Sequence, residues 1–173
     1  GNLVDRGSGY ITYGYDDENQ LSRITSSTSY RTEFFYDGKM RLRRIKEYTW
    51  LSPYGWYPGA ETRYVYDGML VVQERNSANT PAVTYTRGTD LSGTLEGAGG
   101  IGGLLGRSHG YSTATGAWGT HNLYHADGNG NITYLVNASQ GLPASYKYDP
   151  FGRILGSSGT LASANLYRFS SKM

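Results

Sequence analysis

The stretch Tyr146-Lys147-Tyr148-Asp149-Pro150-Phe151-Gly152-Arg153-Ile154-Leu155 decides the fold of this chain. Its two tyrosines, at alternate positions, would face one side of a β-strand. Asp149 can accept hydrogen bonds from backbone N–H groups further along, Pro150 presets φ, and Gly152 can take the left-handed angles of a bulged turn. Residues 153–155 then begin a returning strand, so the stretch predicts a β-hairpin.

Variations of this unit recur along the chain, each with an aromatic residue shortly before an aspartate. The expected turn aspartates are Asp16, Asp37, Asp67, Asp127 and Asp149, and Tyr85-Thr86-Arg87-Gly88-Thr89-Asp90 is a degenerate copy. A recurrence at roughly 21 to 23 residues, with insertions, is typical of repeat proteins whose units bury their faces against their neighbours. Because one hairpin is marginally stable in water, we expect stacked copies to supply the stability.

The composition favours an all-β fold. The 173 residues include 25 glycines, 17 tyrosines and only 4 phenylalanines, and 38% are hydrophobic. Aromatic and β-branched residues beside turn formers favour strands, and amphipathic helical patterns are hard to find. We therefore predict consecutive antiparallel hairpins. Tyrosines should cover one face of the sheet, and polar residues such as Arg23, Glu18, Lys39 and Arg43 the other.

The hairpins resemble the YD repeats of the RHS/YD-repeat family. The segment from Tyr124 to Phe169 is similar to the RHS repeat-associated core, and the match extends over nearly the whole chain. The matching motifs are Asp127-Gly128-Asn129-Gly130-Asn131, Tyr134-Leu135-Val136, Tyr148-Asp149-Pro150-Phe151-Gly152-Arg153, Asn165-Leu166-Tyr167-Arg168-Phe169-Ser170 and the glycine-rich run from Gly97 to Leu105.

This resemblance implies an architecture and a function. It implies a sheet that spirals into a hollow shell, with repeat hairpins over residues 1–120 and the start of the repeat-associated core over residues 121–173. The first segment would hold an irregular insertion near residues 50–60 and a glycine-rich stretch near residues 97–106. In bacterial members such shells enclose a C-terminal toxin, and in the animal teneurins a related barrel belongs to an adhesion receptor. We therefore expect a secreted or cell-surface bacterial protein of the polymorphic-toxin type.

The resemblance also bears on catalysis. RHS cores that release their cargo resemble aspartyl self-proteases with paired Asp-Pro-x-Gly motifs, and this chain has only the copy that begins at Asp149. An aspartyl mechanism needs two carboxylates that share a proton. We therefore expect no enzymatic activity here, with any protease of the parent protein beyond Met173, and assign Asp149 to a turn.

Other apparent motifs lack the context that their chemistry needs. The glycine-rich run from Gly97 matches a dinucleotide-binding pattern by letter, but no strong apolar strand precedes it and no helical pattern follows. We expect a place where backbones approach closely or where the ribbon of strands turns a corner. Ser108 and His109 suggest a nucleophile and its base, but as neighbours in a strand they would point to opposite faces and could not pair directly. His121, His125 and Asp127 have a spacing that suits a metal, but Asp127 is needed at its turn. We expect no cofactor and no metal.

Charge and composition exclude several other classes. The net charge is +2 and the 16 basic residues are spread along the chain, so we expect no nucleic-acid partner. Alternation would place Arg41 and Arg43 on a solvated strand face. The absence of cysteine excludes a disulfide framework. No run reaches the roughly 18 apolar residues of a membrane-spanning helix.

The remaining alternatives concern binding and assembly. Trp50, Tyr54, Trp56 and Tyr57 lie in one stretch with two prolines and two glycines, and they form a candidate binding surface for a carbohydrate or a receptor if they do not pack inside the shell. The chain is either a shell segment around a C-terminal toxin domain of its own parent, a glycan- or receptor-binding module, or a fibre protein that self-associates through exposed strand edges.

Overall fold

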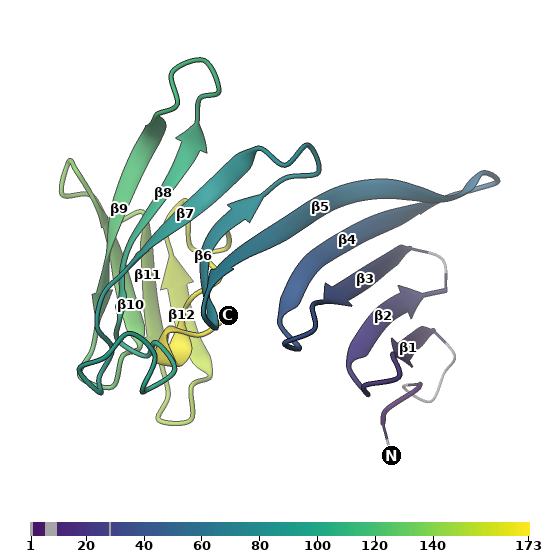
Figure 1. Ribbon diagram of the computed structural model, residues 1–173, viewed down its shortest axis with the longest axis horizontal. Helices are drawn as coiled ribbons and strands as arrows, with labels where there is room; N and C mark the ends of the chain where they lie inside the picture. Colours follow the sequence, from purple (N-terminus) through teal and green to yellow (C-terminus); the bar gives the residue numbers. More distant parts are fainter. Residues whose placement is uncertain (1, 6–9, 28) are drawn as a thin grey trace. The chain divides into compact units, whose positions relative to one another are not determined.

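The computed structural model describes residues 2–5, 10–27 and 29–173, and these residues form an all-β fold (Figure 1). Twelve strands follow one another in chain order within one sheet. The strands are β1 (Ile11–Tyr15), β2 (Leu21–Ser26), β3 (Tyr30–Tyr36), β4 (Leu42–Leu51), β5 (Gly55–Asp67), β6 (Leu70–Arg75), β7 (Pro81–Arg87), β8 (Leu104–Tyr111), β9 (Trp118–Ala126), β10 (Ile132–Asn137), β11 (Ala144–Tyr148) and β12 (Ile154–Ser158). This confirms the predicted class and the consecutive antiparallel hairpins.

The chain divides into two compact units. The first comprises residues 1–65 and 74–80, and the second comprises residues 66–73 and 81–173. The boundary that we predicted between residues 120 and 121 concerns the kinds of repeat and stays a prediction; both residues lie within β9.

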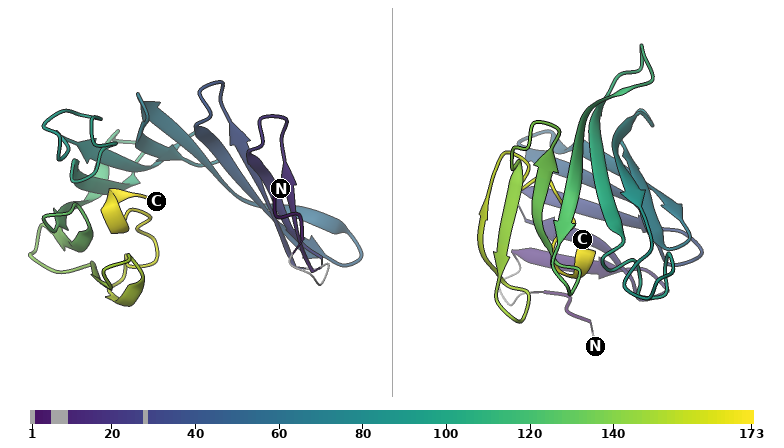
Figure 2. Two further views of the ribbon diagram at one scale, coloured as in Figure 1. Left: turned by 90° about the horizontal axis from the view of Figure 1, so that it is seen from below. Right: turned by 90° about the vertical axis from the view of Figure 1, so that its left-hand side faces the viewer.

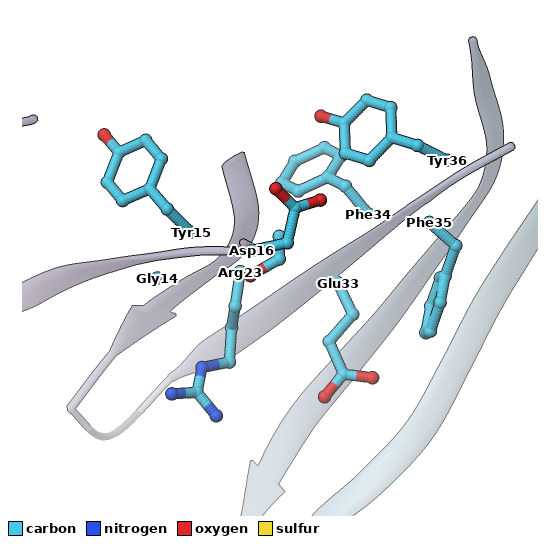
Figure 3. A pocket seen from close by; sticks show the side chains of 9 residues that line it. Gly14, Tyr15, Asp16, Arg23, Glu33, Phe34, Phe35 and Tyr36 are labelled. Atoms are coloured by element: carbon cyan, nitrogen blue, oxygen red, sulfur yellow. The ribbon is translucent and has the colours of Figure 1, made fainter. Parts of the chain in front are cut away.

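In the first unit, cross-strand register sorts the side chains of β1 to β5 onto two faces. Tyr15, Phe34 and Tyr36 point to one face, and Arg23, Glu33 and Phe35 point to the other (Figure 3). The register continues this division, because Phe34 pairs with Ile45 while Glu33 pairs with Lys46. We call these the tyrosine face and the charged face. Among the described residues of this unit, only Tyr64 is buried.

Two predictions for the charged face are wrong in part. Arg23 lies on it, but Glu18 and Lys39 lie in the turns before β2 and β4. Arg41 precedes β4, and its guanidinium bonds the carboxylate of Asp37 instead of standing on a strand face. Arg43 is exposed and lies where the register between β3 and β4 shifts. Alternation fails here because a bulge follows the turn.

The stretch near residues 50–60 is not an irregular insertion. β4 runs to Leu51 and β5 begins at Gly55, so only three residues connect them. The peptide bond between Ser52 and Pro53 is cis, and Gly55 has φ of 92°. The prolines and glycines therefore mark the connection of a long hairpin and a bulge in β5, not a loop.

The second unit has a core because its own C-terminal segment covers one sheet face (Figure 2). Residues 159–173 lie against β7 to β11, where Tyr85 and Tyr167 meet edge to face at 4.9 Å. Ile132 and Leu135 are fully buried beneath this segment. The backbone is tied there as well, since the Ile132 N–H donates to the Arg168 carbonyl at 2.9 Å. Burial of one face between two layers is what stabilises a small β unit.

Candidate functional site

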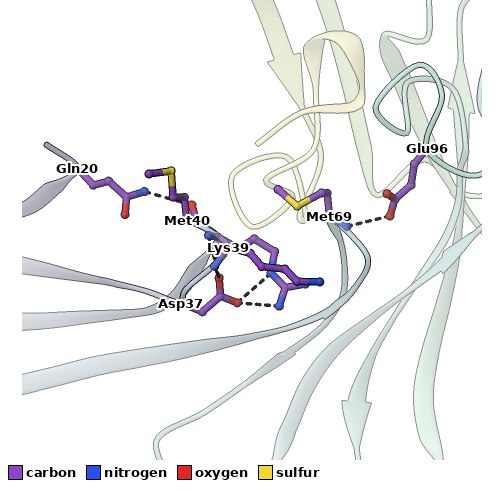
Figure 4. A network of polar contacts seen from close by, with 7 residues as sticks. Gln20, Asp37, Lys39, Met40, Met69 and Glu96 are labelled. Atoms are coloured by element: carbon purple, nitrogen blue, oxygen red, sulfur yellow. Dashed lines mark hydrogen bonds and ion pairs between the residues drawn. The ribbon is translucent and has the colours of Figure 1, made fainter. Parts of the chain in front are cut away.

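The turn between β3 and β4 shows what the repeated aspartates do (Figure 4). The carboxylate of Asp37 accepts hydrogen bonds from the backbone N–H groups of Lys39 (2.9 Å) and Arg41 (3.1 Å), and from the Arg41 guanidinium (2.7 Å). Met40 takes a left-handed φ of 60° and its N–H donates to the Asp37 carbonyl. The Arg41 hydrogen bond above all lowers the pKa of Asp37 to about 2. The aspartate therefore organises a bulged type I turn.

The same geometry recurs at other predicted aspartates. Asp149 accepts from the N–H groups of Phe151 and Arg153, both at 2.9 Å, and Gly152 has φ of 88°. The strand register shifts beside this turn, as a bulge requires. Pro150 occupies the second turn position. Asp16 likewise accepts the N–H of Gln20 at 2.7 Å.

Asp127 makes the turn between β9 and β10 and also serves the C-terminal segment. Its carboxylate accepts from the N–H groups of Asn129 and Asn131 and from the Asn131 side-chain amide. Burial alone would raise the pKa of Asp127, but these bonds outweigh it and lower the pKa. The Asn131 side-chain oxygen in turn accepts the N–H of Ser170 at 2.8 Å. One turn thus fixes both a hairpin and the segment packed on it.

Asp67 differs from the other turn aspartates. β5 ends at Asp67 and β6 begins at Leu70, so the connection has two residues, with Gly68 at φ of 54°. The Met69 N–H donates to the carboxylate of Glu96 at 2.8 Å (Figure 4). A loop carboxylate from further along the chain therefore caps this turn.

Two turn residues escaped the sequence reasoning because they are asparagines. Asn76 accepts the N–H of Thr80 at 2.9 Å, and Asn137 accepts the N–H of Gly141 at 2.8 Å. Their amide oxygens take the place of the aspartate carboxylate. In both turns the asparagine stands four residues before the residue whose N–H it accepts, as the aspartates do, but we predicted turns only at aspartates.

In three of the Tyr-Asp pairs, the tyrosine hydroxyl bonds the backbone of the segment that precedes its hairpin. The Tyr36 hydroxyl donates to the Leu21 carbonyl at 2.9 Å, and the Tyr148 hydroxyl donates to the Ile132 carbonyl at 2.7 Å. Tyr15 bonds the Leu3 carbonyl in the same way, at 3.0 Å. Burial, helped by the nearby Tyr146, raises the pKa of Tyr148 to about 12, so its hydroxyl stays a donor. The pairing therefore ties successive repeats together.

The degenerate copy at Asp90 makes the same tight turn as Asp37, because the Gly93 N–H donates to the Asp90 carbonyl at 2.9 Å, the Asp90 N–H donates to the Thr94 carbonyl at 2.6 Å, and Gly93 has φ of 80°. Asp90 lies in the loop of residues 88–103, where its buried carboxylate accepts from the Ala98 N–H (2.7 Å), the Gly100 N–H (3.0 Å) and the Ser92 hydroxyl (2.6 Å). Burial would raise the pKa of Asp90, but these hydrogen bonds and that of the Ser92 N–H hold it at about 2. The glycine-rich loop thus wraps a carboxylate of its own chain. Backbones do approach closely here, because a Cβ on Gly103 would lie 2.8 Å from the Gly88 carbonyl.

Asn165 joins the sheet to the C-terminal segment in the second unit. It is fully buried, and its side-chain oxygen accepts from the Tyr124 hydroxyl at 2.6 Å. Its amide donates to the Tyr146 hydroxyl (3.2 Å) and to the Tyr167 carbonyl (2.6 Å). Burial raises the pKa of Tyr124 well above its usual range. The sequence reasoning took this asparagine only as part of a family motif.

The candidate binding residues do not share one face. Trp50 and Trp56 pair across the hairpin, with ring centroids 5.2 Å apart and planes at 73°. Tyr57 pairs with Thr49, so it lies on the opposite face. Tyr54 stands in the connection and is 88% exposed. The structure therefore places these rings around the hairpin end and not on a flat platform.

The residues considered for catalysis and metal binding have other partners. Ser108 and His109 point to opposite faces, and the Ser108 hydroxyl instead shares a 2.8 Å hydrogen bond with His121 on the neighbouring strand. His125 bonds the hydroxyl of Thr133. No cluster of three or more His, Asp or Glu side chains suited to a metal occurs in the described parts of the chain. No helix among those residues is long and apolar enough to cross a membrane.

Two of the surface cavities that lie beside the turns have volumes above 500 Å³. One, of about 550 Å³, is lined by Tyr15, Asp16 and Tyr36 with their neighbours (Figure 3). The other, of about 630 Å³, lies by Asp127, Asp149 and Phe169. The aspartates that line these two cavities bond the backbone of their own turns, and Glu33 in the first cavity accepts a hydrogen bond from the Tyr48 hydroxyl at 2.9 Å.

Consecutive antiparallel hairpins with Tyr-Asp turns define an RHS-like fold. Solved structures show the same likeness. A crystal structure of TcdB2-TccC3 matches with a TM-score of 0.58 and 12% identity, covering 94% of this chain and 8% of that chain. TcdB2-TccC3 without its hypervariable C-terminal region matches with a TM-score of 0.59 and 13% identity over the same shares. A Tc holotoxin pore from Photorhabdus luminescens matches with a TM-score of 0.54 and 12% identity, again over 94% and 8%.

These likenesses concern the fold. This chain spans about 8% of the length of the solved chains that it matches. The sequence matches no family model and no curated protein.

Proposed function

We propose that this chain is a structural, non-enzymatic wall segment of an RHS-type shell that encloses or displays another module of its parent protein. The observation that carries the proposal is the fold match over 94% of the chain to TcdB2-TccC3. The parent would be an exported bacterial protein of the polymorphic-toxin type, and its partner would be a C-terminal toxin domain of the same chain.

The construction of the sheet supports a wall. In the first unit, a single layer of strands presents Tyr15, Phe34 and Tyr36 half-exposed on one face and charges on the other. A sheet with one apolar and one charged face suits a boundary between two environments. The tyrosine hydroxyls and turn carboxylates bond neighbouring backbone, as a wall needs, and do not converge on a cleft.

The test is protection of the enclosed module in the parent protein. If the shell encloses a module that is not built of repeats, limited proteolysis of the parent protein should leave that module intact. Replacing Asp127 and Asp149 together with alanine should open the sheet locally and expose that module to digestion. Enclosure would be refuted if the module were digested equally fast in the unsubstituted protein and in the double variant while circular dichroism showed that the strands of both remain folded.

The assembly alternative makes a different prediction. A fibre protein would pair β1 or β12, which end the strand order, with strands of other copies. Its apparent mass would then rise with concentration, whereas a wall segment in its parent keeps a constant mass. Sedimentation of the parent over a range of concentrations separates the two.

A further inference from the structure

The end of the β4–β5 hairpin is an uncharged aromatic finger in the first unit. From Tyr48 to Ala60 the sequence contains no charged residue. The exposed fractions are 37% for Trp50, 43% for Leu51, 88% for Tyr54 and 63% for Tyr57. Large apolar side chains grouped in this way on an exposed end mark an interaction site.

The arrangement of the rings indicates what surrounds the finger. Trp50 and Trp56 lie on the charged face, Tyr57 lies on the tyrosine face and Tyr54 lies at the connection. A sugar or a nucleic-acid base stacks on an open ring face, whereas the two rings that share a face here, Trp50 and Trp56, meet each other edge to face at 73°. Rings on every side instead suit a medium that encloses the finger, and tyrosine and tryptophan settle at the boundary between lipid and water because each has an apolar ring and a polar group.

The backbone of the finger can enter such a medium. Cross-strand pairing continues through Thr49 with Tyr57 and Trp50 with Trp56 to Leu51 with Gly55. Backbone groups that are paired across the hairpin lose less on leaving water than unpaired ones. The finger is therefore structured up to its three-residue connection.

The charged face behind the finger is positive. On β2 to β5 it carries Arg23, Arg31, Arg44, Lys46 and Arg63 against Glu33 and Glu61, which leaves an excess of three positive charges, more than the net +2 of the whole chain. Arg31 lies over the Tyr48 ring at 4.2 Å and Arg44 over the Phe35 ring at 3.8 Å. Basic residues beside an apolar finger attract anionic lipid headgroups.

We propose that this hairpin end inserts into the headgroup region of a bilayer that contains anionic lipids. The insertion is peripheral, to a depth of about 5–10 Å. Lys46 lies five residues before Leu51, or roughly 16 Å along the strand, which places the cations close to the headgroups when the finger is inserted. The proposal adds a membrane contact to the shell segment and does not depend on what the shell encloses.

The test uses vesicles of phosphatidylcholine with and without phosphatidylserine. A Trp118→Phe background leaves Trp50 and Trp56 as the only tryptophans, so a blue shift and quenching by brominated lipid report on the finger alone. We expect binding with both signals, stronger with phosphatidylserine. Tyr54→Ser should reduce partitioning at least about tenfold (roughly 1.4 kcal/mol), and Lys46→Gln should reduce only the preference for phosphatidylserine.

Phe151→Ser is the matched control, because Phe151 is 93% exposed at a different hairpin turn, between the charged residues Lys147 and Arg153. This variant should bind vesicles as strongly as the unsubstituted protein. All variants should keep the melting temperature of the unsubstituted protein. The proposal is overturned if the unsubstituted protein does not bind vesicles, or if Phe151→Ser reduces partitioning as much as Tyr54→Ser. It is also overturned if the protein binds heparin or single-stranded DNA but no vesicles.

Discussion

Replacement of Asn165 by alanine should be among the most damaging single changes in the second unit. The buried Asn165 side chain accepts one hydrogen bond, from Tyr124, and donates two, to Tyr146 and the Tyr167 carbonyl. A typical hydrogen bond contributes about 0.5–1.5 kcal/mol, but a buried group left without its partner costs about 1–3 kcal/mol. The half-buried Tyr124 would lose the acceptor of its hydroxyl, and the space left by the fully buried Asn165 side chain would offer no replacement. We therefore expect a loss of about 3 kcal/mol in the free energy of unfolding.

Urea unfolding followed by tyrosine fluorescence and circular dichroism measures this loss, and for a domain of this size the melting temperature should fall by roughly 6–12 °C. Asn129→Ala is the matched control, since the exposed Asn129 bonds Asp127 through its backbone N–H. The free energy of unfolding of that variant should lie within about 0.5 kcal/mol of that of the unsubstituted protein. If Asn165→Ala were as stable as Asn129→Ala, the C-terminal segment would not be held on the sheet by this asparagine.

Three further predictions follow from turns and buried polar groups. Gly130→Ala should lower the free energy of unfolding by more than about 1 kcal/mol, because Gly130 has φ of 78° and a Cβ there would lie 2.5 Å from Ile101. A Cβ on Gly128, in the same turn, would meet nothing within 4 Å, so Gly128→Ala should leave the melting temperature unchanged. Equal effects of the two substitutions in thermal melts would contradict this. Asn122→Val should stabilise by about 1–3 kcal/mol in urea unfolding, because both amide atoms are buried without a partner, and any loss of stability would show that the amide is satisfied. The pKa values of Asp37 and Asp90 in the folded protein are about 2, below the ordinary 3.8. The ionised carboxylates therefore stabilise the fold fully above about pH 4, and this stabilisation is lost as the pH falls toward 2. Urea midpoints should therefore fall over that range, with a shallower slope when both residues are asparagine, and an unchanged slope would refute the assignment.

The turns were the most predictable part of the fold. At Asp149 the residue types needed by a bulged turn follow one another in the sequence, and Gly152 has the expected left-handed φ. The equivalent left-handed position before β4 is Met40, which no propensity would indicate. There the Asp37–Arg41 bonds impose the turn, so a local rule failed where side-chain contacts decided the conformation.

Longer-range features could not be predicted from one sequence. The glycine-rich loop was expected to bring backbones close, but its organising group is the carboxylate of Asp90, which bonds N–H groups eight and ten residues away. The prediction of an irregular insertion near residues 50–60 failed for another reason. Prolines and glycines were taken as an insertion, whereas the strands continue through them to a three-residue connection. Periodicity across such a bulge cannot be counted without the partner strand.

The high tyrosine content follows from the two environments that one repeat must tolerate. In the first unit the tyrosine face has no covering layer among the described residues, and Tyr36 stays half-exposed with its hydroxyl on the Leu21 carbonyl. In the second unit the C-terminal segment covers the equivalent face, and Tyr146 is only 3% exposed with its hydroxyl on the Ala162 carbonyl. A leucine would suit the second position but would leave apolar surface in water at the first. Because the tyrosine ring packs and its hydroxyl bonds backbone in either setting, the same hairpin serves in an open sheet layer and in a closed core.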